Sequence, residues 1–189
     1  MSKARRAVLP VPTEARVRRA YFDYRYGQLH LHQAIPAGGG FDEATSLLCI
    51  PGNGGLGRFF RPLLLPLARD RSVYAPDLPG CGESDPAPGH AQPAELAAVL
   101  GEFLDLMHLR QIDLLAHDSG VALALALIEQ RPAQVGRVVL SPNTEVVRAQ
   151  QRGLRHPTLI IDLRAADAGD DAAELQQHAA QLRDFLGLA

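Results

Sequence analysis

The hydrophobic residues of the chain follow two kinds of pattern. Continuous apolar runs such as 46–50 (SLLCI) are bounded by turn residues, which is typical of strands that are buried on both faces of a sheet. Between these runs lie longer segments in which apolar residues recur at helical spacing, most clearly at 93–109, where a proline stands in the first turn. The chain therefore combines buried strands with amphipathic helices.

In their order along the chain, these patterns predict an α/β fold. An alternating stretch at 21–35, with a turn at Gly27-Gln28, predicts an N-terminal hairpin. Further strands are predicted at 46–50, 72–75, 112–116, 137–140 and 158–162, and helices at 59–69, 93–109, 120–130 and 172–186. Such alternation favours a largely parallel sheet with helices on both faces. We expect one domain over 21–189, preceded by a basic arm over 1–20.

Composition narrows the range of partners. Of the 189 residues, 47% are hydrophobic and 21% are charged, which excludes global disorder. The net charge of −2 removes the electrostatic argument for nucleic acid or an anionic membrane, and no apolar run reaches the length of a membrane span. The two cysteines, Cys49 and Cys81, are too few for a disulfide scaffold, which indicates a reducing compartment such as the cytoplasm. A small neutral molecule is therefore the expected partner.

Two histidines lie in the predicted hairpin. His30 and His32 are two positions apart, so their side chains share one face of the strand. A metal site would need at least one more ligand, and none is close to them in the sequence. We therefore interpret both as solvated strand residues and expect neither a metal nor a cofactor.

The most informative segment is the turn between the predicted strand at 112–116 and the predicted apolar helix at 120–130. Its sequence is Ala116-His117-Asp118-Ser119-Gly120, with small residues two positions before and two positions after Asp118. A nucleophile elbow needs small side chains at these two places, because its tight turn pushes the central residue out above the sheet. Asp118 thus stands where a nucleophile would, and the alternative is that it only caps the following helix.

These features together resemble the α/β-hydrolase superfamily over residues 21–142. The resemblance rests on the elbow, on the strand and glycine-rich loop at 48–55, and on the string 77–85 (DLPGCGESD), which in that family forms a structural loop. Aspartate at the elbow is similar to the haloalkane dehalogenase and epoxide hydrolase branch, whose carboxylate attacks carbon to form an alkyl-enzyme ester. In dehalogenases an asparagine at the place of Asn53 donates to the departing halide, although a simple turn residue is the other interpretation.

The chain also departs from the family pattern. Pro51 stands where a histidine normally opens the glycine-rich loop, and Ser119 replaces the tryptophan that follows the dehalogenase nucleophile. We expect a shortened C-terminal part with no cap domain, since only one strand and one helix are predicted there. One alignment of this part places Asp167 beside the position of the triad acid, and another places Asp170 at the position of the family histidine. His178 is interpreted as a surface residue.

Two functions follow from this resemblance. In the first, the chain is a hydrolase for a small neutral substrate, with Asp118 as the nucleophile and Asp167 orienting a base. The backbone amides of Asn53 and Ser119 would then stabilise the oxyanion that forms during ester hydrolysis. In the second, the chain lacks the catalytic histidine because it is a non-catalytic binding or assembly protein. A sheet edge exposed by the short C-terminal part predicts a homodimer.

Overall fold

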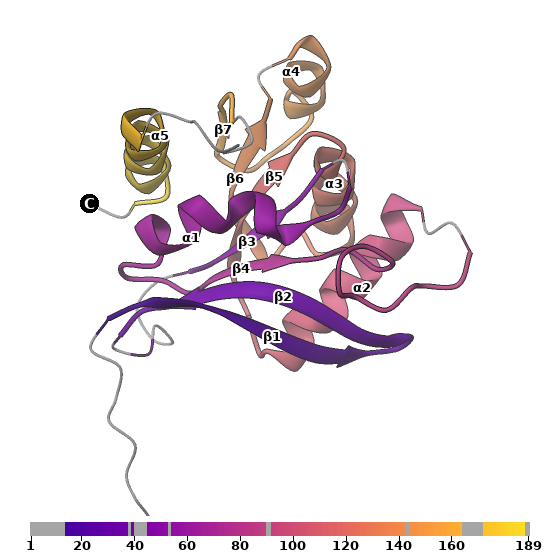
Figure 1. Ribbon diagram of the computed structural model, residues 1–189. Coiled ribbons are helices and arrows are strands. Elements are labelled where there is room, and N and C mark those ends of the chain that lie inside the picture. Colours follow the sequence, from indigo (N-terminus) through magenta and orange to yellow (C-terminus); the bar gives the residue numbers. More distant parts are fainter. Residues whose placement is uncertain are drawn as a thin grey trace, which may run out of the picture.

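The computed structural model of the chain describes residues 14–37, 39, 45–52, 54–89, 92–142, 144–163 and 172–187. Within these residues, seven strands form one sheet in the order β1-β2-β4-β3-β5-β6-β7 (Figure 1). The strands are β1 (Arg16–Tyr24), β2 (Gly27–Ile35), β3 (Ser46–Ile50), β4 (Val73–Pro76), β5 (Ile112–His117), β6 (Val135–Ser141) and β7 (Thr158–Ile160). The ladder from β4 to β7 is parallel, as the alternation of strands and helices predicts.

The N-terminal hairpin is confirmed, but two of its expected boundaries are wrong. Strands β1 and β2 are antiparallel and turn at Arg25 and Tyr26, two residues before the predicted turn. Strand β1 begins at Arg16, so residues 16–20, which we assigned to the basic arm, form the first part of the sheet edge. The three arginines of this part are exposed, and the apolar residues between and after them are partly buried. Exposed charged side chains are typical of an edge strand.

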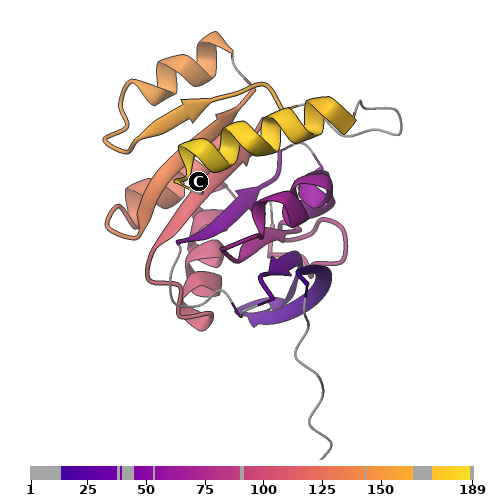
Figure 2. The same cartoon turned by 90° about the vertical axis from the view of Figure 1, so that its left-hand side faces the viewer.

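Helices cover both faces of the sheet (Figures 1 and 2). On one face, α2 (Pro93–Leu106) and α3 (Gly120–Gln130) pack against the larger apolar cluster, which includes Phe103 and Leu127. On the other face, α1 (Arg61–Leu67) and α5 (Ala172–Phe185) lie side by side over a second cluster, which includes Leu64 and Leu182. The central strands are therefore buried from both sides, and β3 is buried at every position.

Two helical segments differ from the sequence prediction. The segment expected as one helix at 59–69 consists of a short 3-10 helix, η1 (Gly57–Phe60), followed by α1. A helix that was not predicted, α4 (Glu145–Gln151), joins β6 to β7. Thr144 is its N-cap, and the Thr144 hydroxyl accepts a hydrogen bond from the Val147 N–H. The start of this helix therefore depends on a cap and not on a periodic apolar pattern.

A buried ion pair connects the sheet to the end of α5. A guanidinium nitrogen of Arg71 lies 2.6 Å from a carboxylate oxygen of Asp113, and both side chains are almost completely buried. The guanidinium of Arg71 also donates to the carbonyl of Leu186, and Asp113 accepts from the backbone N–H of Arg137. The position of α5 therefore depends on a charged group inside the protein. None of the helices in the described ranges has the length and hydropathy that a membrane crossing requires.

Candidate functional site

Asp118 lies at a sharp turn between β5 and α3. Its φ of 51° is in the left-handed region, which few residues other than glycine adopt without cost. The N–H of Asp118 donates to the carbonyl of Ser141 at 2.6 Å, and its carbonyl accepts from the Val121 N–H at 3.0 Å. The turn is thus tied to the end of β6 on one side and to the first turn of α3 on the other.

Two glycines allow close packing at this turn: Gly52, in the loop after β3, and Gly120, at the start of α3. A Cβ atom at Gly52 would lie 2.5 Å from the Cβ of Asp118 and 2.6 Å from the carbonyl oxygen of His117. A Cβ atom at Gly120 would lie 2.5 Å from the carbonyl oxygen of Pro51. Any larger side chain at either glycine would push the loop after β3 away from the turn. The elbow geometry predicted from the small flanking residues is therefore present around Asp118.

Ser119 offers its backbone rather than its side chain at this turn. The residue is exposed, and its hydroxyl makes no capping hydrogen bond to α3. Among the described residues, no acceptor receives the Ser119 N–H. An amide at the start of a helix that is free in this way is suited to stabilise negative charge. Asn53, Asp167 and Asp170, the other predicted site residues, lie outside the described residues.

His117 lies next to Asp118 in the chain but makes its contacts elsewhere. Its ring stacks on Phe59 of η1, and its Nδ1 is 3.1 Å from the hydroxyl oxygen of the buried Ser141. The same hydroxyl oxygen accepts a hydrogen bond from the Leu163 N–H, so its own proton is available to the His117 ring. Burial lowers the pKa of His117, against a weaker opposite effect of Asp118. Both effects of the surroundings, burial and the hydroxyl donor, favour the neutral ring.

Within the described ranges, no histidine nitrogen is hydrogen-bonded to the carboxylate of Asp118. His117 is engaged with Ser141, and His178 lies half-buried on α5. The elbow therefore presents a carboxylate without an adjacent base among these residues.

The string 77–85 forms a loop that Asp77 holds together from the end of β4. One carboxylate oxygen of Asp77 accepts from the Gly57 N–H at 2.7 Å, and the other accepts from the Glu83 N–H at 3.2 Å. A Cβ atom at Gly82, where φ is 55°, would collide with the Asp77 carboxylate. These contacts agree with the structural role that the resemblance implied for this segment.

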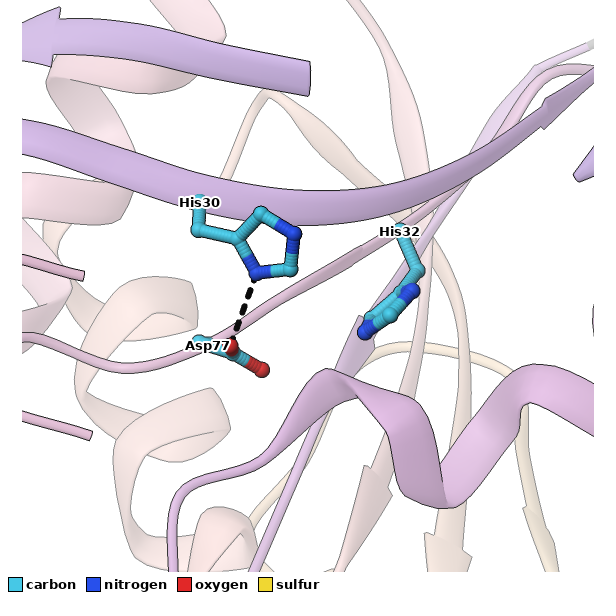
Figure 3. Close-up of side chains that lie close together, drawn as sticks. All are labelled: His30, His32 and Asp77. Atoms are coloured by element: carbon cyan, nitrogen blue, oxygen red, sulfur yellow. Dashed lines mark hydrogen bonds and ion pairs between the residues drawn. The ribbon is translucent and has the colours of Figure 1, made fainter. Parts of the chain in front are cut away.

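The interpretation of His30 as a solvated residue is wrong and His32 is only partly solvated; both side chains lie beside Asp77 (Figure 3). His30 is only 2% exposed, and its Nδ1 lies 2.8 Å from a carboxylate oxygen of Asp77. His32 is half-buried, and its ring meets that of His30 edge to face, with centroids 4.9 Å apart. This arrangement could not be predicted from spacing, because Asp77 is far from both histidines along the chain. Antiparallel pairing of β2 with β4, with the Asp77 N–H donating to the His30 carbonyl, brings the three side chains together.

Comparison with known families decides the relationship of the chain. The model of the alpha/beta hydrolase family matches residues 47–188, which is more than half of the sequence. The chain belongs to the α/β-hydrolase family. The turn at Asp118 and the loop at 77–85 of this α/β-hydrolase both lie inside the matched region.

Solved structures with the same fold include enzymes named as epoxide hydrolases. An alpha/beta hydrolase from Novosphingobium aromaticivorans matches with 26% identity and a TM-score of 0.59, covering 66% of this chain and 43% of its own. The protein Cfl2 from Burkholderia cenocepacia matches with 21% identity and a TM-score of 0.60, covering 88% and 51%. An epoxide hydrolase from Vigna radiata matches with 20% identity and a TM-score of 0.58, covering 72% and 46%. This α/β-hydrolase thus spans about half the length of these relatives or less.

Proposed function

We propose that this α/β-hydrolase uses Asp118 as a nucleophile on an electrophilic carbon of a small neutral epoxide or haloalkane. The observation that carries the proposal is the left-handed backbone of Asp118 at the strand-to-helix turn, packed between Gly52 and Gly120. A strained backbone is retained at a functional position because it aims the side chain. The fold is shared with the Vigna radiata epoxide hydrolase at 20% identity, a likeness that concerns the fold alone.

The first step is formation of an ester. A carboxylate oxygen of Asp118 donates an electron pair to the substrate carbon and forms a C–O bond. In an epoxide, the ring C–O bond breaks and its oxygen takes a proton from solvent, whereas in a haloalkane the halide leaves with the bonding electrons. The product is a neutral ester of Asp118, which carries either a hydroxyalkyl or an alkyl group.

The second step is hydrolysis of that ester. Water attacks the ester carbonyl carbon and loses a proton to solvent, which produces a tetrahedral oxyanion. The oxyanion collapses by breaking the bond to the alcohol oxygen, and that oxygen takes a proton from solvent as the alcohol leaves. The Ser119 N–H, which meets no acceptor among the described residues, is available to stabilise this oxyanion. We assign the second amide to Asn53 and the orientation of a base to Asp167. Because no base lies beside Asp118 among the described residues, this second step is expected to be slower than the first.

Intact-mass spectrometry tests the first step directly. The purified chain is incubated with styrene oxide, and in parallel with 1-bromobutane. We expect a single adduct with the mass of one whole epoxide, or of one butyl group, which peptide mapping places on Asp118. The Asp118→Asn variant should show no adduct, and the Asp105→Asn variant, which changes an aspartate whose side chain is 59% exposed on α2, should react like the parent. Circular dichroism confirms that both variants are folded.

Isotope labelling tests the second step. In water enriched in oxygen-18, attack at the ester carbonyl leaves the label in the Asp118 carboxylate after one turnover, whereas direct addition of water to the substrate carbon leaves it only in the product alcohol. An absent adduct together with absent turnover would exclude the hydrolase proposal.

A second candidate function is a non-catalytic binding or assembly protein, and the observation in its favour is that His117 contacts Ser141 rather than Asp118. For this candidate we propose self-association of the chain, since β7 pairs only with β6 among the described strands. Ligand affinity that is equal in the parent and the Asp118→Asn variant, with no adduct in either, would favour this function. Sedimentation of a monomer at micromolar concentration would count against the assembly.

A further inference from the structure

Three potential metal ligands lie together at the end of β4, away from the elbow. They are His30 and His32 of β2 and Asp77, which we call the His-Asp cluster, and one donor atom from each lies within 4.8 Å of the other two (Figure 3). Imidazole nitrogens with a carboxylate oxygen are the donor set that zinc and similar first-row ions prefer. Three protein ligands are also the number found where a fourth position is left to water.

His30 shows an unfilled bonding position. Its side chain is almost fully buried, and its Nδ1 faces an Asp77 oxygen, which as a carboxylate can only accept. In the neutral ring the Nε2 atom then carries the free lone pair. This atom is buried and has no hydrogen-bond partner among the described residues. A buried acceptor without a partner is unfavourable, and a bound cation would remove that cost.

His32 provides a second nitrogen that is reachable from solvent. One of its ring nitrogens belongs to the three donor atoms that lie within 4.8 Å of one another. The side chain is half-buried, which leaves a route by which an ion could enter.

Asp77 can bind a cation without releasing the loop it holds. Its two oxygens already accept from the N–H groups of Gly57 and Glu83. Each carboxylate oxygen has two lone pairs, and the oxygen that accepts from Gly57 makes no other hydrogen bond among the described residues, so its second lone pair is a position that an ion could use. The backbone hydrogen bonds that support the Asp77 carboxylate would then act as outer-shell contacts that orient it.

We propose that the His-Asp cluster is a binding site for a zinc-like divalent transition-metal ion, which links β2 to the loop after β4. The ion is held by one ring nitrogen from each of His30 and His32 and by one oxygen of Asp77, with water as the remaining ligand. Its role is structural: it stabilises the hairpin on the parallel part of the sheet. The site is independent of the proposed chemistry at Asp118, because none of its ligands belongs to the elbow.

Zinc titration of tag-free protein tests this site. After dialysis against a chelator, the chain is titrated with Zn²⁺ in competition with a chromophoric chelator, and separately with Co²⁺ while the visible absorption is followed. We expect one ion per chain, a cobalt spectrum typical of nitrogen and oxygen ligands at low coordination number, and a higher unfolding temperature with zinc. The His32→Gln variant should lose at least about tenfold in affinity, because a direct ligand costs no less than an outer-shell contact.

Two control variants change histidines outside the His-Asp cluster. His156→Gln and His178→Gln change residues on the loop before β7 and on α5, and both should bind zinc like the parent. His30→Gln is the second cluster variant and should also lose the ion, provided that circular dichroism shows a folded protein. A parent that binds no zinc after dialysis, or a His32→Gln variant that binds as tightly as the parent, would overturn the proposal.

Discussion

The imidazole ring of His117 lies flat against the phenyl ring of Phe59, with centroids 4.3 Å apart and planes inclined by 17°. This stack connects the residue before the elbow to η1, and the hydroxyl of Ser141 holds the ring from its Nδ1 side. Both partners suit a neutral ring: the phenyl face excludes water from one side, and the Ser141 hydroxyl can donate to an unprotonated Nδ1.

We expect the stability of the protein to fall on mild acidification, partly because of His117. Its pKa is lowered by burial, so below about pH 6.5, the ordinary value for histidine, the unfolded chain binds a proton that the folded chain does not. The stabilising effect of the neutral ring is therefore present above that pH and is lost as the pH falls through the folded-state pKa. Urea unfolding at pH 7.5 and pH 5.5 should show a smaller loss in His117→Gln than in the parent. Equal losses in both proteins would contradict this account, and His178→Gln serves as the control that should behave like the parent.

Ser141→Ala should lower the free energy of unfolding by about 1–3 kcal/mol, because the Leu163 N–H would lose its buried acceptor. The same change removes the hydroxyl from His117. The exposed Ser119, whose hydroxyl makes no capping bond, offers the matched control, and Ser119→Ala should change stability by less than about 0.5 kcal/mol. Urea denaturation of the two variants beside the parent measures the difference. The prediction fails if both serine variants are equally stable.

Substitutions at Asp118 should separate backbone strain from side-chain chemistry. Glycine adopts a φ of 51° freely, so Asp118→Gly should keep the stability of the parent or raise it by up to about 1 kcal/mol. Valine is branched at Cβ and tolerates this region poorly, so Asp118→Val should cost about 1–3 kcal/mol. Neither variant should form the ester adduct. Thermal and urea unfolding test the order of stabilities, and a glycine variant less stable than the valine variant would show that the turn is not strained.

The buried pair of Arg71 and Asp113 should behave differently when one or both partners are removed. Asp113→Leu leaves the Arg71 charge buried without a counterion and should cost about 3–5 kcal/mol. The double variant Arg71→Met/Asp113→Leu should be less destabilised than the single one, because no unpaired charge remains. Asp105→Asn breaks the exposed pair with Arg131 and should cost less than about 1 kcal/mol. A double-mutant cycle with no coupling between Arg71 and Asp113 would contradict this interpretation.

Gly120 and Gly153 should respond in opposite ways to a methyl group. Gly120→Ala places a Cβ 2.5 Å from the Pro51 carbonyl oxygen and should cost about 1–3 kcal/mol, because backbone atoms have to move. At Gly153 the nearest atom, the Gln150 carbonyl oxygen, would be 3.8 Å away, so Gly153→Ala should be neutral or stabilise by up to about 1 kcal/mol. Unfolding temperatures of the two variants give the comparison. Equal unfolding temperatures of the two alanine variants would contradict the close approach of Gly120 to the Pro51 carbonyl.

Much of the fold could be predicted from local pattern because the central strands are buried on both faces. Runs such as Ser46–Ile50 are continuously apolar, and α3 is bounded by a glycine and a proline, so its limits at 120 and 130 were predicted as observed. Helix α4 was missed because it has few apolar residues and depends on the capping hydroxyl of Thr144. Periodicity carries no information about a single cap.

The elbow and the His-Asp cluster differ in how far the sequence can predict them. The elbow is formed by neighbours in the chain, so the small residues around Asp118 are visible in the sequence. The cluster depends on β2 pairing with β4, which sets Asp77 beside His30 across 47 residues of sequence. No spacing rule along the chain expresses that contact, and this is why both histidines were expected to be solvated.

The hydrogen bond from the Asp118 N–H to the Ser141 carbonyl depends on the register in which the central strands pair. It forms only when β5 and β6 pair in the register that sets His117 opposite Ser141, and Gly52 meets Asp118 only when Ile50 lies opposite Ala116. A slip of one residue in either ladder would leave every side chain present and the secondary structure content unchanged, yet dismantle the turn. Reactivity at Asp118 would therefore report on strand register in the centre of the sheet, which circular dichroism cannot detect.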